Sequence, residues 1–179
     1  MLGEIPMNAF AAVCQLFVAL AFLSIPLVRH RFGPVAKAAA DAELAGQGVR
    51  PAVLEENGLR FDAGGHETWA PVAVAAAMTT LAVLNFAQHS WSTPLTWIFQ
   101  CAVIAMNALI LYSNLTAVKS VEAAFRRKND AELARIDVAA FLKAAENAFP
   151  SWVQLLQKAR HTIVFGSSAI ALTAITLAA

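Results

Sequence analysis

Four long apolar segments without a charged side chain constrain this chain more than any other feature of its sequence. They cover residues 8–28, 71–88, 95–118 and 162–179, and none of them contains Asp, Glu, Lys or Arg. About 20 apolar residues in a helix cross the roughly 30 Å hydrocarbon core of a bilayer. Because lipid offers no partner to an exposed backbone, and the segments are too long for barrel strands, each should be helical. The sequence therefore predicts an all-α membrane protein, with residues 1–179 forming a single integral domain around a four-transmembrane-helix bundle.

The composition agrees with a membrane protein and excludes several other classes. Apolar residues make up 59% of the chain and charged residues 14%, whereas soluble domains average about 45–50% and about 25%. With 13 Lys and Arg against 12 Asp and Glu, no basic excess points to nucleic acid, and we expect no such partner. Cys14 and Cys101 lie in apolar segments and form no CxxC motif, which argues against a disulfide scaffold.

The basic residues are confined to the two long connections between the apolar segments. All 13 Lys and Arg lie there, whereas the N-terminal segment, the turn at 89–94 and the C-terminus contain none. Loops rich in Lys and Arg stay on the cytoplasmic side. We therefore expect two cytoplasmic loops and both termini outside, and the Ala-rich, compact chain suits a bacterial inner membrane. Aromatic and basic side chains favour the headgroup level, and the expected interface residues are Trp69, Trp91, Trp152, Arg29, Arg31 and Arg160.

Both long loops have the pattern of helices. In the first loop, Pro34 suits the first turn of a helix that Gly46 would end. In the second loop, the third apolar segment is expected to continue in water as far as Lys128. Asn129, with Glu132 three residues later, resembles a capping box that would start the next helix.

An internal repeat is one interpretation of the two halves. A shift of 89 residues aligns Asp41–Ala45 with the identical pentapeptide Asp130–Ala134, and the expected topology and loop lengths also match. The alternative is coincidence in an Ala-rich sequence. If the repeat is real, residues 1–89 and 90–179 are parallel copies of a two-span unit, because each contains an even number of spans.

Neutral polar side chains are the most informative residues inside the spans. Gln100, Asn107 and Asn114 lie in the third segment, and the first two are seven residues apart, on roughly one helix face. Asn85 approaches the outer end of the second segment. One interpretation is hydrogen bonding between helices, worth about 0.6–2 kcal/mol per contact in membranes. The other is a polar pathway or a cleft for a lipid headgroup.

Catalytic and cofactor signals are weak. The sequence contains no P-loop, GxSxG or HExxH motif, so we expect no catalytic residues, no bound metal and no enzyme. His30 and His161 lie at the cytoplasmic ends of the first and fourth spans, where a bis-histidine haem site is conceivable. Each also adjoins arginine, which is common at a membrane edge, and we expect no cofactor.

The sequence leaves two functions open beside this haem hypothesis. The first is a non-catalytic accessory, assembly or scaffolding subunit of a larger membrane complex, with other membrane proteins as partners. The alternative is a small transporter or flippase-like protein, assembled from copies of itself, that moves a small solute or lipid. In the second case Gln100, Asn107 and Asn114 would line the route. In both cases the bilayer is the main contact of the chain.

Overall fold

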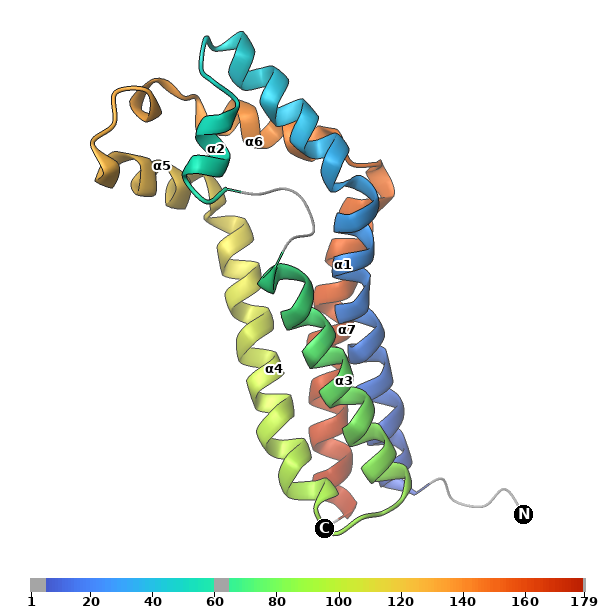
Figure 1. The fold of residues 1–179 in the computed structure, drawn as a ribbon. Helices are drawn as coiled ribbons and strands as arrows, with labels where there is room; N and C mark the ends of the chain where they lie inside the picture. Colours follow the sequence, from blue (N-terminus) through green and yellow to red (C-terminus); the bar gives the residue numbers. More distant parts are fainter. Residues whose placement is uncertain (1–5, 60–64, 179) are drawn as a thin grey trace. The chain divides into compact units, whose positions relative to one another are not determined.

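The computed structural model describes residues 6–59 and 65–178, and both ranges are built from helices and short connections without a strand (Figure 1). In chain order the elements are α1 (Met7–Gly46), α2 (Ala52–Glu56), α3 (His66–Phe86), α4 (Ser92–Leu115), α5 (Ala117–Lys128), the 3₁₀ helix η1 (Leu133–Arg135), α6 (Val138–Asn147) and α7 (Ser151–Ala178).

Within the described residues, four helices are long and apolar enough to cross a membrane, which confirms the four segments expected from hydropathy. These stretches are Met7–Gly46, Thr68–Phe86, Ser92–Leu115 and Ser151–Ala178. The chain divides into two compact units. We call residues 6–26, 65–111 and 156–178 the bundle unit, and residues 27–59 and 112–155 the loop unit.

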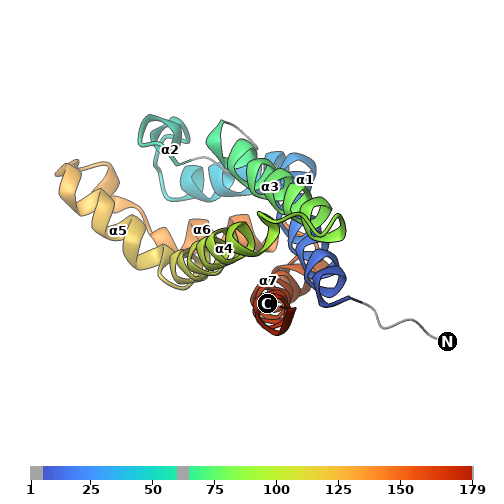
Figure 2. The same cartoon turned by 90° about the horizontal axis from the view of Figure 1, so that it is seen from below.

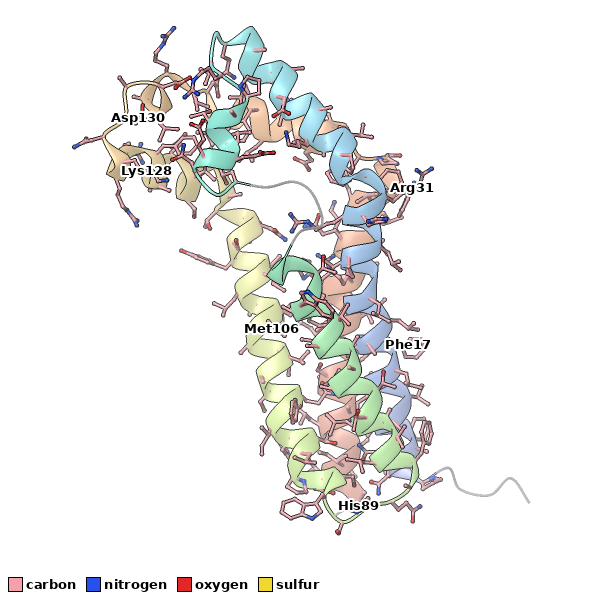
Figure 3. The ribbon with its side chains drawn as sticks, in the orientation of Figure 1. Phe17, Arg31, His89, Met106, Lys128 and Asp130 are labelled. Atoms are coloured by element: carbon pink, nitrogen blue, oxygen red, sulfur yellow. The ribbon has the colours of Figure 1, made fainter. Side chains whose placement is uncertain are left out.

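In the bundle unit, parts of α1, α3, α4 and α7 run side by side (Figures 1 and 2). Small buried residues such as Ala11, Ala75 and Ala171, each no more than 3% exposed, line its interior. Small side chains let helix backbones approach closely where lipid is as apolar as the helices themselves. Large apolar side chains cover the outside. Leu109 is 68% exposed, and Phe17 points away from the bundle in Figure 3.

The first helix is longer than the sequence predicts. The separate helix expected to start at Pro34 is wrong, because α1 is one continuous helix from Met7 to Gly46. A proline inside a helix costs about 3 kcal/mol. Beyond Pro34, Ala36, Ala40 and Leu44 recur every fourth residue and are fully buried in an apolar core, and this packing offsets the cost. The predicted end at Gly46 is confirmed.

The helix that the sequence predicts from Asn129 in the second loop starts later, as α6 at Val138. Asn129 does not start a helix, so the capping-box interpretation with Glu132 is wrong. It ends α5 in the left-handed conformation, with φ of 49°, a conformation that asparagine tolerates. The true N-cap is Asp137, whose carboxylate accepts a hydrogen bond from the backbone N–H of Ala140 at 3.0 Å and so starts α6.

The loop unit has an apolar core built from both loops. Its fully or nearly buried side chains include Leu44 and Val53 from the first loop, and Leu133 and Phe141 from the second. Polar bonds at the surface also join the two loops. Arg50 donates to Glu132 at 2.9 Å, and the backbone N–H of Asp137 donates to Gln47 at 2.8 Å.

The pentapeptide that suggested a repeat adopts two conformations. Asp41–Ala45 is helical within α1, whereas Asp130–Ala134 forms a turn that leads into η1. Local sequence is a weak determinant of conformation compared with tertiary packing. The repeat of residues 1–89 in 90–179 stays a prediction.

Candidate functional site: a polar column in the bundle unit

The buried face of α4 is mostly polar. Its buried residues are Ser92, Thr96, Gln100, Val103 and Asn107. The spacing of three or four residues places them on one side of the helix. At a rise of 1.5 Å per residue they extend over about 22 Å, most of the roughly 30 Å hydrocarbon core of a bilayer. A helix that faces its neighbours with amides and hydroxyls is unusual in so apolar a chain.

Together with polar side chains of the other three long helices, the four polar residues of this α4 face form what we call the polar column. Its members are all buried and all belong to the bundle unit: Gln15, Asn85, Ser92, Thr96, Gln100, Asn107, His161 and Ser168.

The first layer of the polar column joins three helices. The Gln15 amide of α1 donates to the Thr96 hydroxyl oxygen of α4 at 3.0 Å. The Asn85 amide of α3 donates to the same oxygen at 2.9 Å and to the Gln15 carbonyl oxygen at 3.1 Å. No more than 1% of any of the three side chains is exposed. Their bonds therefore hold α1, α3 and α4 together from the inside.

Two further layers, which we call rungs, join α4 to α7. The Ser168 hydroxyl donates to the Gln100 carbonyl oxygen at 2.9 Å. Nδ1 of His161 lies 2.9 Å from the side-chain oxygen of Asn107. The partners are seven residues apart in both helices but in opposite directions, so α4 and α7 pair antiparallel with rungs about 10.5 Å apart.

An apolar layer separates the two rungs. Val103 lies between Gln100 and Asn107 on α4, and Val164 lies between His161 and Ser168 on α7. Both valines are buried in the same apolar cluster, at 3% and 0% exposure. The polar column is therefore interrupted near the middle of α4.

Four side chains of the column keep a buried polar atom without a hydrogen-bond partner among the described residues. These atoms are Asn85 Oδ1, Gln100 Nε2, Asn107 Nδ2 and His161 Nε2. Each side chain is more than nine-tenths buried. An unpaired buried donor or acceptor costs about 1–3 kcal/mol, and buried polar groups normally find a partner. The column thus combines bonds that fix the helices with groups still able to bind a guest.

The structure brings together two of the three residues predicted for a polar pathway. Gln100 and Asn107 lie in the polar column, whereas Asn114 is exposed and belongs to the loop unit. The two histidines considered for haem are also in different units. His30 is exposed in the loop unit, and His161 uses one ring nitrogen to bond Asn107 in the bundle unit. Over residues 6–59 and 65–178, no group of three His, Cys, Asp or Glu is placed to hold a metal.

The predicted interface residues are at least partly accessible. Trp69, Trp91 and Trp152 are 72%, 63% and 50% exposed. Within the loop unit, the Trp152 ring packs edge-on against Phe32 at 5.7 Å, and the Arg31 guanidinium lies over the same ring at 5.9 Å. Arg29 and Arg160 are half-buried.

Four members of the column were missed by reasoning from the sequence: Gln15, Ser92, Thr96 and Ser168. Gln15 had a usable signal, because an amide in the middle of an uncharged apolar segment needs a buried partner. Ser92, Thr96 and Ser168 had none, since hydroxyl side chains in a membrane helix commonly bond their own backbone. In this chain Thr79 and Thr173 do so, each donating to the carbonyl four residues earlier.

Comparison of the chain with protein-family models, with curated proteins and with solved structures gives no match.

Proposed function

We propose that the chain is a small membrane transport protein and that the polar column binds a small polar solute on its way across. The unpaired atoms of Asn85, Gln100, Asn107 and His161 carry this proposal. A column that only held helices together would pair its groups with one another, because each unpaired one costs about 1–3 kcal/mol. A passing solute supplies the missing partners.

The position of the rungs also supports transport. Gln100 and Asn107 stand about one turn on either side of the middle of α4 (Ser92–Leu115), and transporters bind their substrates near the middle of the bilayer. The apolar layer of Val103 and Val164 would block the direct passage of a polar solute from one rung to the other. A route with polar sites on both sides of a closed apolar layer suits a protein that exposes one side at a time.

The test is uptake by liposomes that contain the purified chain. The probes are isotope-labelled glycerol, urea, methanesulfonate and tetramethylammonium, and protein-free liposomes give the background. We expect at least one probe to enter faster than background, and Asn107→Leu to abolish that flux. Asn114→Leu is the matched control, because this asparagine is exposed and outside the column. Background flux for every probe, or equal flux in both variants, would refute the proposal.

An accessory or scaffolding subunit is the second candidate, and the loop unit favours it. A plain connection between spans needs no core, whereas this unit buries Leu44, Val53 and Phe141 and joins its two loops through Arg50 and Glu132. Such a unit is suited to carry a docking surface for other membrane subunits. Extraction of a tagged chain from native membranes in mild detergent tests this, with measurement of particle mass and of co-purifying chains. This second candidate predicts foreign subunits in stoichiometric amounts, and a homo-oligomer alone would reject it.

We further propose that the chain sits in a bacterial inner membrane with both long loops in the cytoplasm and both termini outside. The support is the confinement of all 13 Lys and Arg to those loops. Single cysteines at two exposed positions, Ser90→Cys and Arg127→Cys, report orientation in a chain whose Cys14 and Cys101 are replaced by alanine. A membrane-impermeant maleimide added to intact cells should label position 90 alone, and labelling of position 127 alone would invert the topology.

A further inference from the structure

The rung of Asn107 and His161 has a hydrogen-bonding pattern that specifies its guest. Both residues are more than nine-tenths buried, at 1% and 8% exposure. Their mutual contact of 2.9 Å occupies one atom of each. Nδ2 of Asn107 and Nε2 of His161 have no partner among the described residues, so the rung offers two open positions.

The open positions are always one donor and one acceptor when the imidazole is neutral. The Asn107 oxygen only accepts, so Nδ1 of His161 must carry the hydrogen that lies between them. Nε2 is then a lone-pair acceptor, and the Asn107 NH₂ group is a free donor. If the amide is turned over, Nδ2 donates to Nδ1, which leaves the Asn107 oxygen as acceptor and Nε2–H as donor. The pattern is the same in both arrangements.

We infer, on the basis of the proposed transport function, that this rung binds a neutral hydroxyl or primary amide group and rejects ions. Hydroxyl and amide groups both donate and accept, so a polyol or a primary amide can meet the open acceptor with one of its polar atoms and the open donor with another. An anion such as a sulfonate would face the open acceptor with another acceptor. A quaternary ammonium ion would offer the same acceptor no hydrogen to bind.

The surroundings of the rung strengthen this selection. The four apolar segments contain no Asp, Glu, Lys or Arg that could neutralise an ion inside the column, and an unpaired ion is costly at membrane depth. Arg160, just before the fourth segment, is half-buried; its charge repels cations, so the rejection of anions rests on the open acceptor of the rung. The apolar layer of Val103 and Val164 next to the rung suits a short carbon skeleton. The substrate class is therefore a small neutral polyol or amide.

The same four probes test the inference in liposomes. We expect wild-type protein to raise glycerol or urea flux at least tenfold over protein-free liposomes, and to leave methanesulfonate and tetramethylammonium at background. Flux of either ion that equals or exceeds that of the neutral probes would overturn the inference but leave transport standing. Background flux for all four probes would remove both the inference and the proposed function.

Variants of the rung separate binding from a purely structural role. We expect His161→Phe to reduce neutral-solute flux at least tenfold, and His161→Gln to retain part of it, because an amide again offers a donor and an acceptor. Equal flux in the two variants would contradict the assignment of the site. If both variants fail to fold, the selectivity of the wild-type protein among the four probes still decides.

Discussion

Replacement of Asn107 by leucine tests the stability that the polar column gives to the bundle. The substitution removes the 2.9 Å contact with His161 and leaves the imidazole buried without its partner. The lost contact is worth about 0.6–2 kcal/mol, and the unpaired polar group costs about 1–3 kcal/mol more. Leucine is branched like asparagine, though larger, and the substitution also removes the unpaired Nδ2 atom, which recovers part of this cost. We expect a net loss of about 1–3 kcal/mol in the free energy of unfolding.

A double-mutant cycle separates the bond from the rest of this cost. We expect His161→Phe alone to destabilise the chain to a similar degree, since it leaves the Asn107 amide unpaired. The double variant removes both polar partners and should be more stable than the sum of the single effects, by about 0.5–3 kcal/mol, as residues in contact usually are. The assay is reversible unfolding in mixed detergent micelles, followed by circular dichroism.

The control for this cycle is Asn114→Leu, which changes an exposed asparagine outside the column. It should shift the free energy of unfolding by no more than about 0.5 kcal/mol. Additive effects of the two column substitutions, within about 0.3 kcal/mol, would show that Asn107 and His161 are not coupled. That result would refute the reasoning that the rungs tie α4 to α7.

Three further predictions concern the loop unit, and thermal unfolding of the variants checks each of them. Leu44→Ala should cost about 2–5 kcal/mol because Leu44 is fully buried, whereas Leu155→Ala, at a position 69% exposed, should cost less than about 0.5 kcal/mol; equal losses would contradict the core. Asp137→Ala should cost about 0.5–2 kcal/mol through the lost N-cap of α6, and Asp137→Asn should be nearly neutral, since asparagine also caps; the reverse order would be unexpected. Hydrogen bonds from Arg50 hold the pKa of Glu132 below its ordinary value. The stability that this pair adds is therefore complete above the unfolded-state pKa of about 4.3, and it is lost as the pH falls through the lower pKa of the folded state. The melting temperatures of wild type and Glu132→Gln should converge at acidic pH. A constant difference between them down to pH 3 would be evidence against the pair.

Hydropathy predicted the four spans because it measures the property that selects them. An uncharged segment of about 20 apolar residues is stable in a bilayer core and costly in water, whatever its neighbours are. The ends of the helices depend on packing instead. Pro34 is typical of a helix start, but the burial of Ala36, Ala40 and Leu44 keeps α1 helical on both sides of this proline. Asn129 and Asp137 are both good cap residues. Which of them starts a helix depends on which of the following segments reaches the core.

The site was only half predictable for a similar reason. The seven-residue spacing of Gln100 and Asn107 places them on one face of a single helix, so the sequence was enough to group them. Their partners Ser168 and His161 come from a helix far along the chain, and that pairing depends on the register between α4 and α7. Asn114 continues the same spacing, yet it is exposed in the loop unit. Periodicity identifies a face of a helix but does not show how far along that face the neighbours extend.

The register of the rungs limits how α7 could move during the proposed transport. A slide of α7 along α4 by one turn, about 5.4 Å, would break both rungs together, at about 0.6–2 kcal/mol each. A tilt about the layer of Val103 and Val164 would instead open the rung on one side while the other stayed closed. Tilting therefore costs about half as much as sliding, and the open rung regains a partner when a neutral solute enters it. Contacts at a pivot change least in a tilt, and Val103 and Val164 would form that pivot in one apolar cluster, so the geometry favours a transport step in which one rung opens at a time.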